Sequence, residues 1–200
     1  MKLEKYDYYL VLDLEATCCN QETIQRHEME IIEIGAVMVE AQSLTILDEF
    51  QTFIKPIRFP RLTEFCQSLT SITQMQVDQA PGYGEAIGLL QEWLLTYPNA
   101  VFGSWGDFDR NQFKQDSKFH DVPFPIAYPH VNLKKLFSKT QKLPKRYGMA
   151  EALQLAEIDL EGTHHRGIDD ARNIAKLLPF ILGRQWLNPP TTVQMKTINS

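Results

Sequence analysis

The sequence predicts an α/β protein, built on a mixed sheet of about five strands that is covered by helices. Two observations lead to this prediction. Three β-rich runs open the chain, and a polar break between the second and third suits an antiparallel hairpin. Helix-like and strand-like patterns then alternate along the rest of the chain, as expected when helices flank a sheet.

The first predicted strand covers residues 8–15 (YYLVLDLE), which are mostly apolar until acidic residues appear. Such a run is typical of a central strand that is buried on both faces. The second predicted strand covers residues 31–39 and the third residues 44–54, with polar residues 40–43 between them. These two runs therefore predict the hairpin.

A helix is predicted next, because apolar residues recur at helical spacing at positions 87, 90, 93 and 94 and Pro98 follows them. Residues 100–104 predict a short strand, 108–119 a helix and 128–133 a last strand. The chain from there to Leu182 is expected to be mainly helical.

The composition favours one globular domain. With 200 residues and 44% hydrophobic content, the chain can bury a single sizeable core. We expect this domain to cover residues 1–187, and the polar, proline-containing residues 188–200 to form a flexible tail.

The chain shows no secretory signal at its start, and charged residues interrupt every apolar run before the roughly 18 residues of a membrane span. A soluble, cytoplasmic protein without membrane contact is therefore expected. Cys18, Cys19 and Cys66 lack the spacing of a zinc site or of a disulfide framework, so reduced thiols are expected.

The net charge of −5 argues against a protein that coats duplex nucleic acid through a globally positive surface. One segment nevertheless contains six basic residues and no acidic residue: Lys134, Lys135, Lys139, Lys142, Lys145 and Arg146. It is either a solvated helix face with its following loop or a patch that binds phosphates.

Two carboxylates end the first predicted strand. Because side chains alternate across a strand, Asp13 and Glu15 project from one face while Leu12 and Leu14 project from the other. Like charges this close repel each other, and a hard divalent cation with oxygen ligands would relieve the repulsion. Solvated acids at a strand end are the competing interpretation.

Two further acids, Asp107 and Asp109, follow the strand predicted at residues 100–104, where the chain turns through Gly106 into a helix. Either acid could instead cap that helix, a role that contributes about 1 kcal/mol. For each residue taken alone, capping is the simpler interpretation.

A histidine-rich loop precedes the last amphipathic helix. His165 and Asp170 are five residues apart, and both could face a cleft from the start of that helix. A histidine in a loop is usually solvated, so this segment indicates function only in combination with the others.

Together, these three segments resemble the DEDDh class of 3′-to-5′ exonucleases, whose fold is similar to that of ribonuclease H. The resemblance places the first motif on Asp13 and Glu15, and the third on His165 and Asp170. The second motif falls on Asp109, because Phe113 follows it four residues later. Asp107 is the alternative for this position.

The resemblance extends from about residue 8 to residue 182. Residues 62–74 (LTEFCQSLTSITQ) and the Glu-Ala-Thr-Cys run at 15–18 are similar to the branch that degrades histone mRNA and small interfering RNA. Removal of nucleotides from the 3′ hydroxyl end of a single strand, RNA rather than DNA, is therefore implied.

The resemblance also implies the roles of individual residues. Four acids would hold two divalent metal ions, Mg²⁺ or Mn²⁺: Asp13, Glu15, Asp109 and Asp170. His165 would be the general base. Ala16 and Thr17 would contact the terminal sugar, and either Trp105 or Phe108 would stack on bases unless these aromatic residues belong to the core.

Two other functions are compatible with the fold. One is a DNA exonuclease with the same chemistry. The other is a noncatalytic ribonuclease-H-like module that binds nucleic acid or protein. The presence of an acid at every motif position argues against the noncatalytic module, because a binding module has no need for four converging carboxylates.

Overall fold

Five strands form one mixed sheet in the order β3-β2-β1-β4-β5. β2 pairs with β1 and β3 antiparallel, whereas β4 pairs parallel with both β1 and β5. The strands are β1 (Tyr8–Ala16), β2 (Ile31–Glu40), β3 (Ile46–Phe53), β4 (Ala100–Ser104) and β5 (His130–Asn132). The predicted mixed five-stranded sheet flanked by helices is confirmed.

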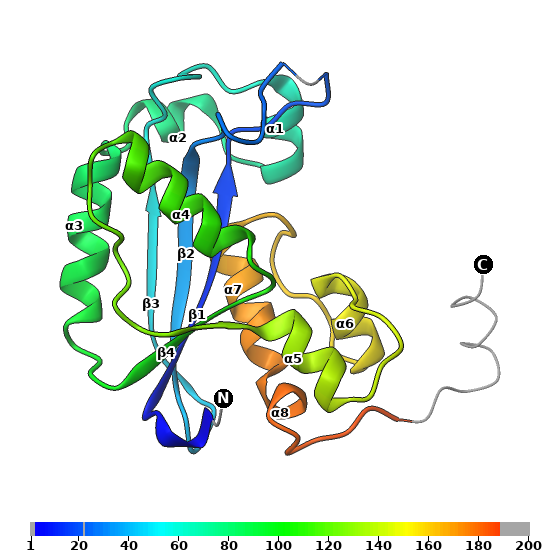
Figure 1. Ribbon diagram of the computed structural model, residues 1–200. Coiled ribbons are helices and arrows are strands. Elements are labelled where there is room, and N and C mark those ends of the chain that lie inside the picture. Colours follow the sequence, from blue (N-terminus) through cyan, green and yellow to red (C-terminus); the bar gives the residue numbers. More distant parts are fainter. Residues whose placement is uncertain (1–2, 22, 189–200) are drawn as a thin grey trace.

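The computed structural model describes residues 3–21 and 23–188, so nearly all of the predicted tail, 189–200, lies outside the described residues. Figure 1 shows the helices around the sheet. They are η1 (Leu3–Lys5), α1 (Glu64–Thr70), α2 (Gln74–Asp78), α3 (Tyr83–Leu94), α4 (Phe108–Phe119), α5 (Leu133–Thr140), α6 (Met149–Leu155), α7 (Gly167–Lys176) and α8 (Leu178–Ile181). No described helix is both long and apolar enough to cross a membrane.

The last strand is shorter than the sequence predicts, because a helix begins at Leu133. The side chain of Asn132 accepts a hydrogen bond from the backbone N–H of Lys135 and so caps α5. Such a cap satisfies a backbone donor that the first helical turn leaves free. The chain therefore leaves β5 three residues after it enters the strand.

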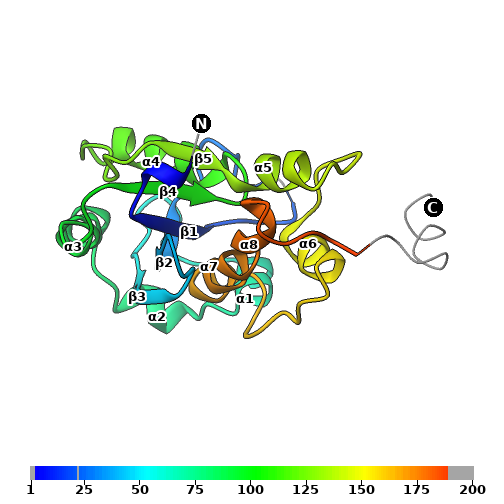
Figure 2. The ribbon, with the colours of Figure 1, turned by 90° about the horizontal axis from the view of Figure 1, so that it is seen from below.

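The sheet is buried on both faces, and alternate residues of its strands enter two different cores. Leu10, Leu12 and Leu14 of β1 pack with α3 and with Phe113 of α4. Tyr9 and Val11 face the opposite core, formed with α5, α6, α7 and α8. Figure 2 shows α3 on one side of the sheet and α7 and α8 on the other.

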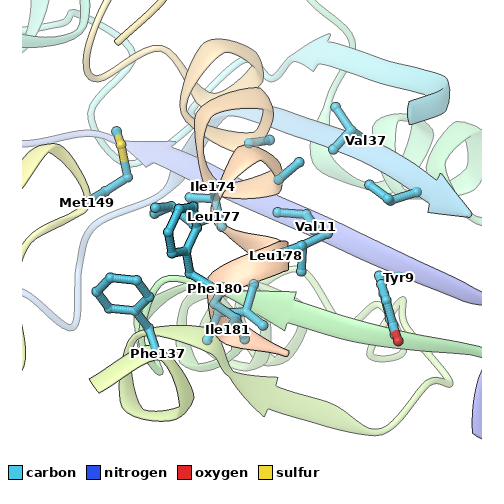
Figure 3. Packing of buried hydrophobic residues seen from close by; sticks show 14 of the residues in the cluster. Tyr9, Val11, Val37, Phe137, Met149, Ile174, Leu177, Leu178, Phe180 and Ile181 are labelled. Atoms are coloured by element: carbon cyan, nitrogen blue, oxygen red, sulfur yellow. The ribbon is translucent and has the colours of Figure 1, made fainter. Parts of the chain in front are cut away.

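The core between the sheet and α7 is closely packed. In Figure 3, Ile174 of α7 and Leu177, which caps its C-terminus, lie near Val11 of β1, and Phe137 of α5 packs in the same cluster. These buried aliphatic and aromatic side chains each contribute roughly 1.5–3 kcal/mol relative to an exposed side chain. α7 is thereby held against β1 and β2.

Two glycines let the start of α7 touch the sheet directly. A Cβ on Gly35 of β2 would lie 2.0 Å from the carbonyl carbon of Gly167. A Cβ on Gly167 would lie 3.0 Å from the carbonyl oxygen of Asp13. Without side chains at these positions, the first turn of α7 reaches the carboxyl end of β1.

Candidate active site

Three carboxylates meet where β1 ends and α7 begins. Asp13 and Glu15 come from β1, and Asp170 comes from the first turn of α7. Each of them offers an oxygen, and these oxygens lie within 4.8 Å of one another. The close contact between Gly35 and Gly167 is what brings Asp170 to the strand.

The fourth predicted acid, Asp109, reaches the same strand from α4. Its Oδ1 accepts a hydrogen bond from the backbone N–H of Leu14 at 3.1 Å, and the residue is buried. Leu14 lies between Asp13 and Glu15 in β1. This bond therefore holds Asp109 beside the carboxylate pair.

Asp107, the alternative to Asp109, points elsewhere. Its side chain is half exposed, pairs with Arg110 at 3.3 Å and accepts a hydrogen bond from Asn132 at 2.8 Å. It occupies the N-cap position of α4 but makes no side-chain capping bond. Asp109 thus lies with the other acids, whereas Asp107 faces the start of α5.

The electrostatics of the four acids reflect crowding. Burial, together with the carboxylates of Asp109, Glu15 and Asp170, raises the pKa of Asp13 well above its usual range. Burial and the same kind of repulsion raise the pKa of Glu15 to about 9. Burial also raises the pKa of Asp109 to about 6. Without a cation, the ionised forms of these carboxylates are therefore disfavoured.

This donor set fits a hard divalent cation. Carboxylate oxygens are the ligands that Mg²⁺ and Mn²⁺ prefer, and a cation between them would favour their ionised forms. In the described residues, the oxygens of Asp13, Glu15 and Asp170 are close enough to share one ion.

Both histidines of the loop before α7 lie at this site. Nδ1 of His164 is 3.1 Å from Oδ2 of Asp170. The backbone N–H of His165 donates to the same oxygen at 3.1 Å, and the two imidazole rings stack with centroids 4.0 Å apart. His165 has a φ of 64°, a left-handed conformation that histidine adopts more readily than most residues.

The residues after Glu15 are packed into the structure. Thr17 is buried, and its hydroxyl accepts the backbone N–H of Glu30 at 2.9 Å. The carbonyl oxygen of Ala16 accepts the thiol of Cys66 at 3.7 Å. These bonds hold the chain rigidly where it leaves β1.

The two predicted stacking residues are partly buried. The indole N–H of Trp105 donates to the carbonyl oxygen of Tyr147 at 3.1 Å, and its ring packs 5.8 Å from that of Phe137. The guanidinium of Arg26 lies over the ring of Phe108, 5.5 Å from its centroid. Trp105 thus rests on α5, and Phe108 faces the loop after β1.

A buried ion pair supports the histidine loop and was not predicted. Glu33 of β2 is fully buried and accepts the Nε–H of Arg166 at 3.1 Å and the backbone N–H of Gly167 at 3.1 Å. Arg166 follows His165 directly and is the N-cap residue of α7. The sequence does offer one signal for this pair: Glu33 is a single acid inside an otherwise apolar strand, and a buried charge needs a partner.

We expect Glu33→Ala to lower the free energy of unfolding by about 3–5 kcal/mol, because Arg166, whose side chain is only 19% exposed, would lose its charged partner and the N–H of Gly167 its acceptor. Urea unfolding of both proteins measures this change. Glu49→Ala is the matched control, because it breaks an ion pair with Arg172 whose side chains are 42% and 37% exposed. That change should cost less than about 1 kcal/mol. Equal losses in the two variants would contradict the role of burial.

Comparison with known proteins identifies similar sequences. Residues 10–178 match the model of a protein family described as exonuclease. ERI1 exoribonuclease 3 of Mus musculus is 30% identical over 198 residues, which cover 94% of this chain and 58% of the relative. The 3′-5′ exoribonuclease 1 of Homo sapiens is 31% identical and is covered over 51% of its length. The chain thus spans only part of the length of these relatives.

A solved structure agrees over almost the same region. The nuclease domain of 3′hExo, a DEDDh family member bound to rAMP, superposes with a TM-score of 0.82 at 27% identity. The match covers 93% of this chain and 98% of that domain. CRN-4, a cell-death related nuclease, has the same fold at 22% identity with a TM-score of 0.77.

Proposed function

The chain belongs to the exonuclease family that it matches over residues 10–178, and from this premise we propose that it is a 3′-to-5′ exonuclease of single-stranded RNA. The convergence of the oxygens of Asp13, Glu15 and Asp170 within 4.8 Å carries the proposal. RNA is preferred over DNA because the relatives are named as exoribonucleases. A cytoplasmic location stays a prediction from the sequence.

Asp13, Glu15, Asp109 and Asp170 are proposed to hold two divalent metal ions, Mg²⁺ or Mn²⁺. Such ions, when bound, stabilise the charge that develops on phosphate oxygens during hydrolysis and make bound water a better nucleophile. The hydrogen bond from the backbone N–H of Leu14 holds the Asp109 carboxylate in position at the site.

His165 is proposed to accept the proton of the attacking water. Within the described chain, no hydrogen bond engages its ring, whereas the ring of His164 contacts Asp170. The imidazole of His165 is therefore free to take up a proton. The contact of its backbone N–H with Asp170 keeps it beside the carboxylates.

The terminal nucleotide is proposed to lie against the chain that follows β1. Ala16 and Thr17 are both buried and would form the floor beneath the terminal sugar, where the hydrogen bond from the backbone N–H of Glu30 holds Thr17 in place. Trp105 or Phe108 would stack on a base, an interaction worth about 1–3 kcal/mol. Trp105 lies four residues before Asp109, and Phe108 lies directly before it.

The proposed function is tested by digestion of matched single-stranded RNA and DNA oligonucleotides with Mg²⁺ present. We expect release of nucleotides from 3′ hydroxyl ends, faster on RNA, and none after EDTA treatment. Circular single strands should survive, because they offer no end to the pocket. Cleavage of circles would indicate an endonuclease, and equal rates on blunt duplexes would contradict the preference for single strands.

The choice between the two acids of the second motif is tested in the same assay. Asp109→Asn should lose most of the activity, because it removes a charge from the carboxylate cluster but keeps the oxygen that binds Leu14. Asp107→Asn should lose little, because its half-exposed side chain pairs with Arg110 away from the cluster. The reverse order would move the second motif to Asp107.

A further inference from the structure

The basic segment, defined as residues 134–146, forms a positive surface in an otherwise acidic protein. Its six cations make up almost a third of the 20 lysines and arginines in a chain whose net charge is −5. Five of them are exposed, and Lys134 is half-buried. No ion pair in the described chain involves any of the six. Their charge is therefore available to a ligand.

The two residues that flank the basic segment both contact the turn between β4 and Asp109. Asn132, which caps α5, donates its side-chain N–H to Asp107 at 2.8 Å. At the other end, the carbonyl oxygen of Tyr147 accepts the indole N–H of Trp105 at 3.1 Å. Trp105 and Asp107 follow β4 and precede Asp109. The basic segment is thus fixed on both sides to the turn that leads from β4 to Asp109.

The middle of the basic segment is also held in place. Gln141 follows α5, and its side-chain N–H donates to the carbonyl oxygens of Phe180 at 2.7 Å and Gln185 at 2.9 Å. Its side-chain oxygen accepts the backbone N–H of Leu187 at 3.0 Å. The chain that follows α5 is therefore anchored at Gln141 to α8 and to the residues after it.

The positions of the lysines on α5 do not stabilise the helix. Lys134 and Lys135 lie in its first turn, which contains no acidic residue. Positive charge there opposes the helix dipole and costs about 0.3–1 kcal/mol per residue. A solvated helix face would favour acids at these positions. Helix stability therefore does not account for the lysines at these two positions.

We propose that the basic segment binds the sugar-phosphate backbone of the substrate strand on the 5′ side of the nucleotide that is removed. This inference rests on the proposed function, because the strand is placed by a 3′ end lying among the carboxylates. The segment would supply affinity for the backbone phosphates, since cations that contact phosphates provide most of the sequence-independent affinity of a protein for nucleic acid.

The test removes two charges from α5 and compares them with a matched pair on α4. Lys135→Gln/Lys139→Gln changes two exposed lysines four residues apart, and Lys114→Gln/Lys118→Gln does the same on α4. Glutamine has a helix propensity close to that of lysine, and both variants have the same net charge. Lys135→Arg/Lys139→Arg keeps the charge and should behave like the wild type.

Two measurements are made on each protein. The first is binding of a long single-stranded RNA in EDTA, followed by fluorescence anisotropy over a range of salt concentrations. For the α5 variant we expect the slope of log affinity against log salt to become shallower by about 1.4, which is roughly 0.7 for each lost phosphate contact. The second is hydrolysis with Mg²⁺ of the same RNA and of a dinucleotide. The α5 variant should raise KM for the long RNA and leave the dinucleotide unchanged.

The outcomes separate the two proposals. If the wild type hydrolyses no RNA, the proposed function fails, and the salt slopes still test the basic segment. If the wild type is active but the α5 and α4 variants show the same slope, the basic segment does not bind the strand. A loss on the dinucleotide equal to that on the long RNA would also overturn the inference, because it would indicate damage to the active site.

Discussion

Replacing Asp13 or Asp170 by asparagine should abolish nucleotide release and leave the fold intact. Each change removes one charge from the group of oxygens that lie within 4.8 Å of one another and preserves the shape of the side chain. The loss should exceed the roughly 10²- to 10⁴-fold contribution of a general base, because every proposed metal contact of that residue is weakened. Single-turnover rates at saturating Mg²⁺ measure it.

Thermal unfolding supplies the second readout for these two variants. Without metal, the wild type must bury carboxylates that repel each other, so Asp13→Asn should unfold at the same temperature or a higher one. With Mg²⁺ or Mn²⁺ added, the wild type should gain stability, because a ligand that binds only the folded state stabilises it. The variants should gain much less. Near wild-type turnover in either variant would refute its assignment as a metal ligand.

The acidic cluster shows which features of a site can be predicted from sequence. Asp13 and Glu15 share a face because side chains alternate along β1, and this rule needs no tertiary information. Asp170 joins them only because Gly35 and Gly167 allow the backbones of β2 and α7 to touch. That contact joins residues 132 positions apart, and no local pattern contains it. The resemblance to a known family supplied the missing step.

The same division holds for the fold. The bounds of β4 and α4 agree with the predicted ranges 100–104 and 108–119, because turn residues and a helical pattern mark them locally. The end of β5 was misplaced, since polar and apolar residues alternate from His130 to Leu133 as in a strand, and the side chain of Asn132 decides where α5 begins. The central position of β1 depends on a parallel pairing with β4 across about 90 residues, so hydrophobic periodicity could indicate burial but not the neighbour.

Glu33 was overlooked for a related reason. The apolar character of residues 31–39 predicts the strand, but nothing in that pattern identifies a partner for the acid. Its partner, Arg166, is 133 residues away and directly follows His165. A buried acid predicts that a cation exists, and only the packing of α7 on β2 shows which one.

Replacing His165 by alanine should reduce cleavage by roughly 10²- to 10⁴-fold without abolishing it, because a general base contributes that much while the carboxylates would still hold the metal ions. The thermal gain on adding Mg²⁺ should stay near that of the wild type. His165→Asn should show the same loss. Asparagine tolerates the left-handed backbone at this position, so it separates the missing imidazole from any change in the loop.

His164 is the internal control for this prediction. Its ring stacks on that of His165 and its Nδ1 contacts Asp170, so His164→Ala removes an imidazole from the same loop. We expect a smaller loss, because the ring of His165 is the one left free to accept a proton. If His164→Ala loses the activity and His165→Ala retains it, the general base is the neighbouring histidine. If both variants stay active, a histidine general base must be given up, since neither ring would then be needed to take the proton from the attacking water.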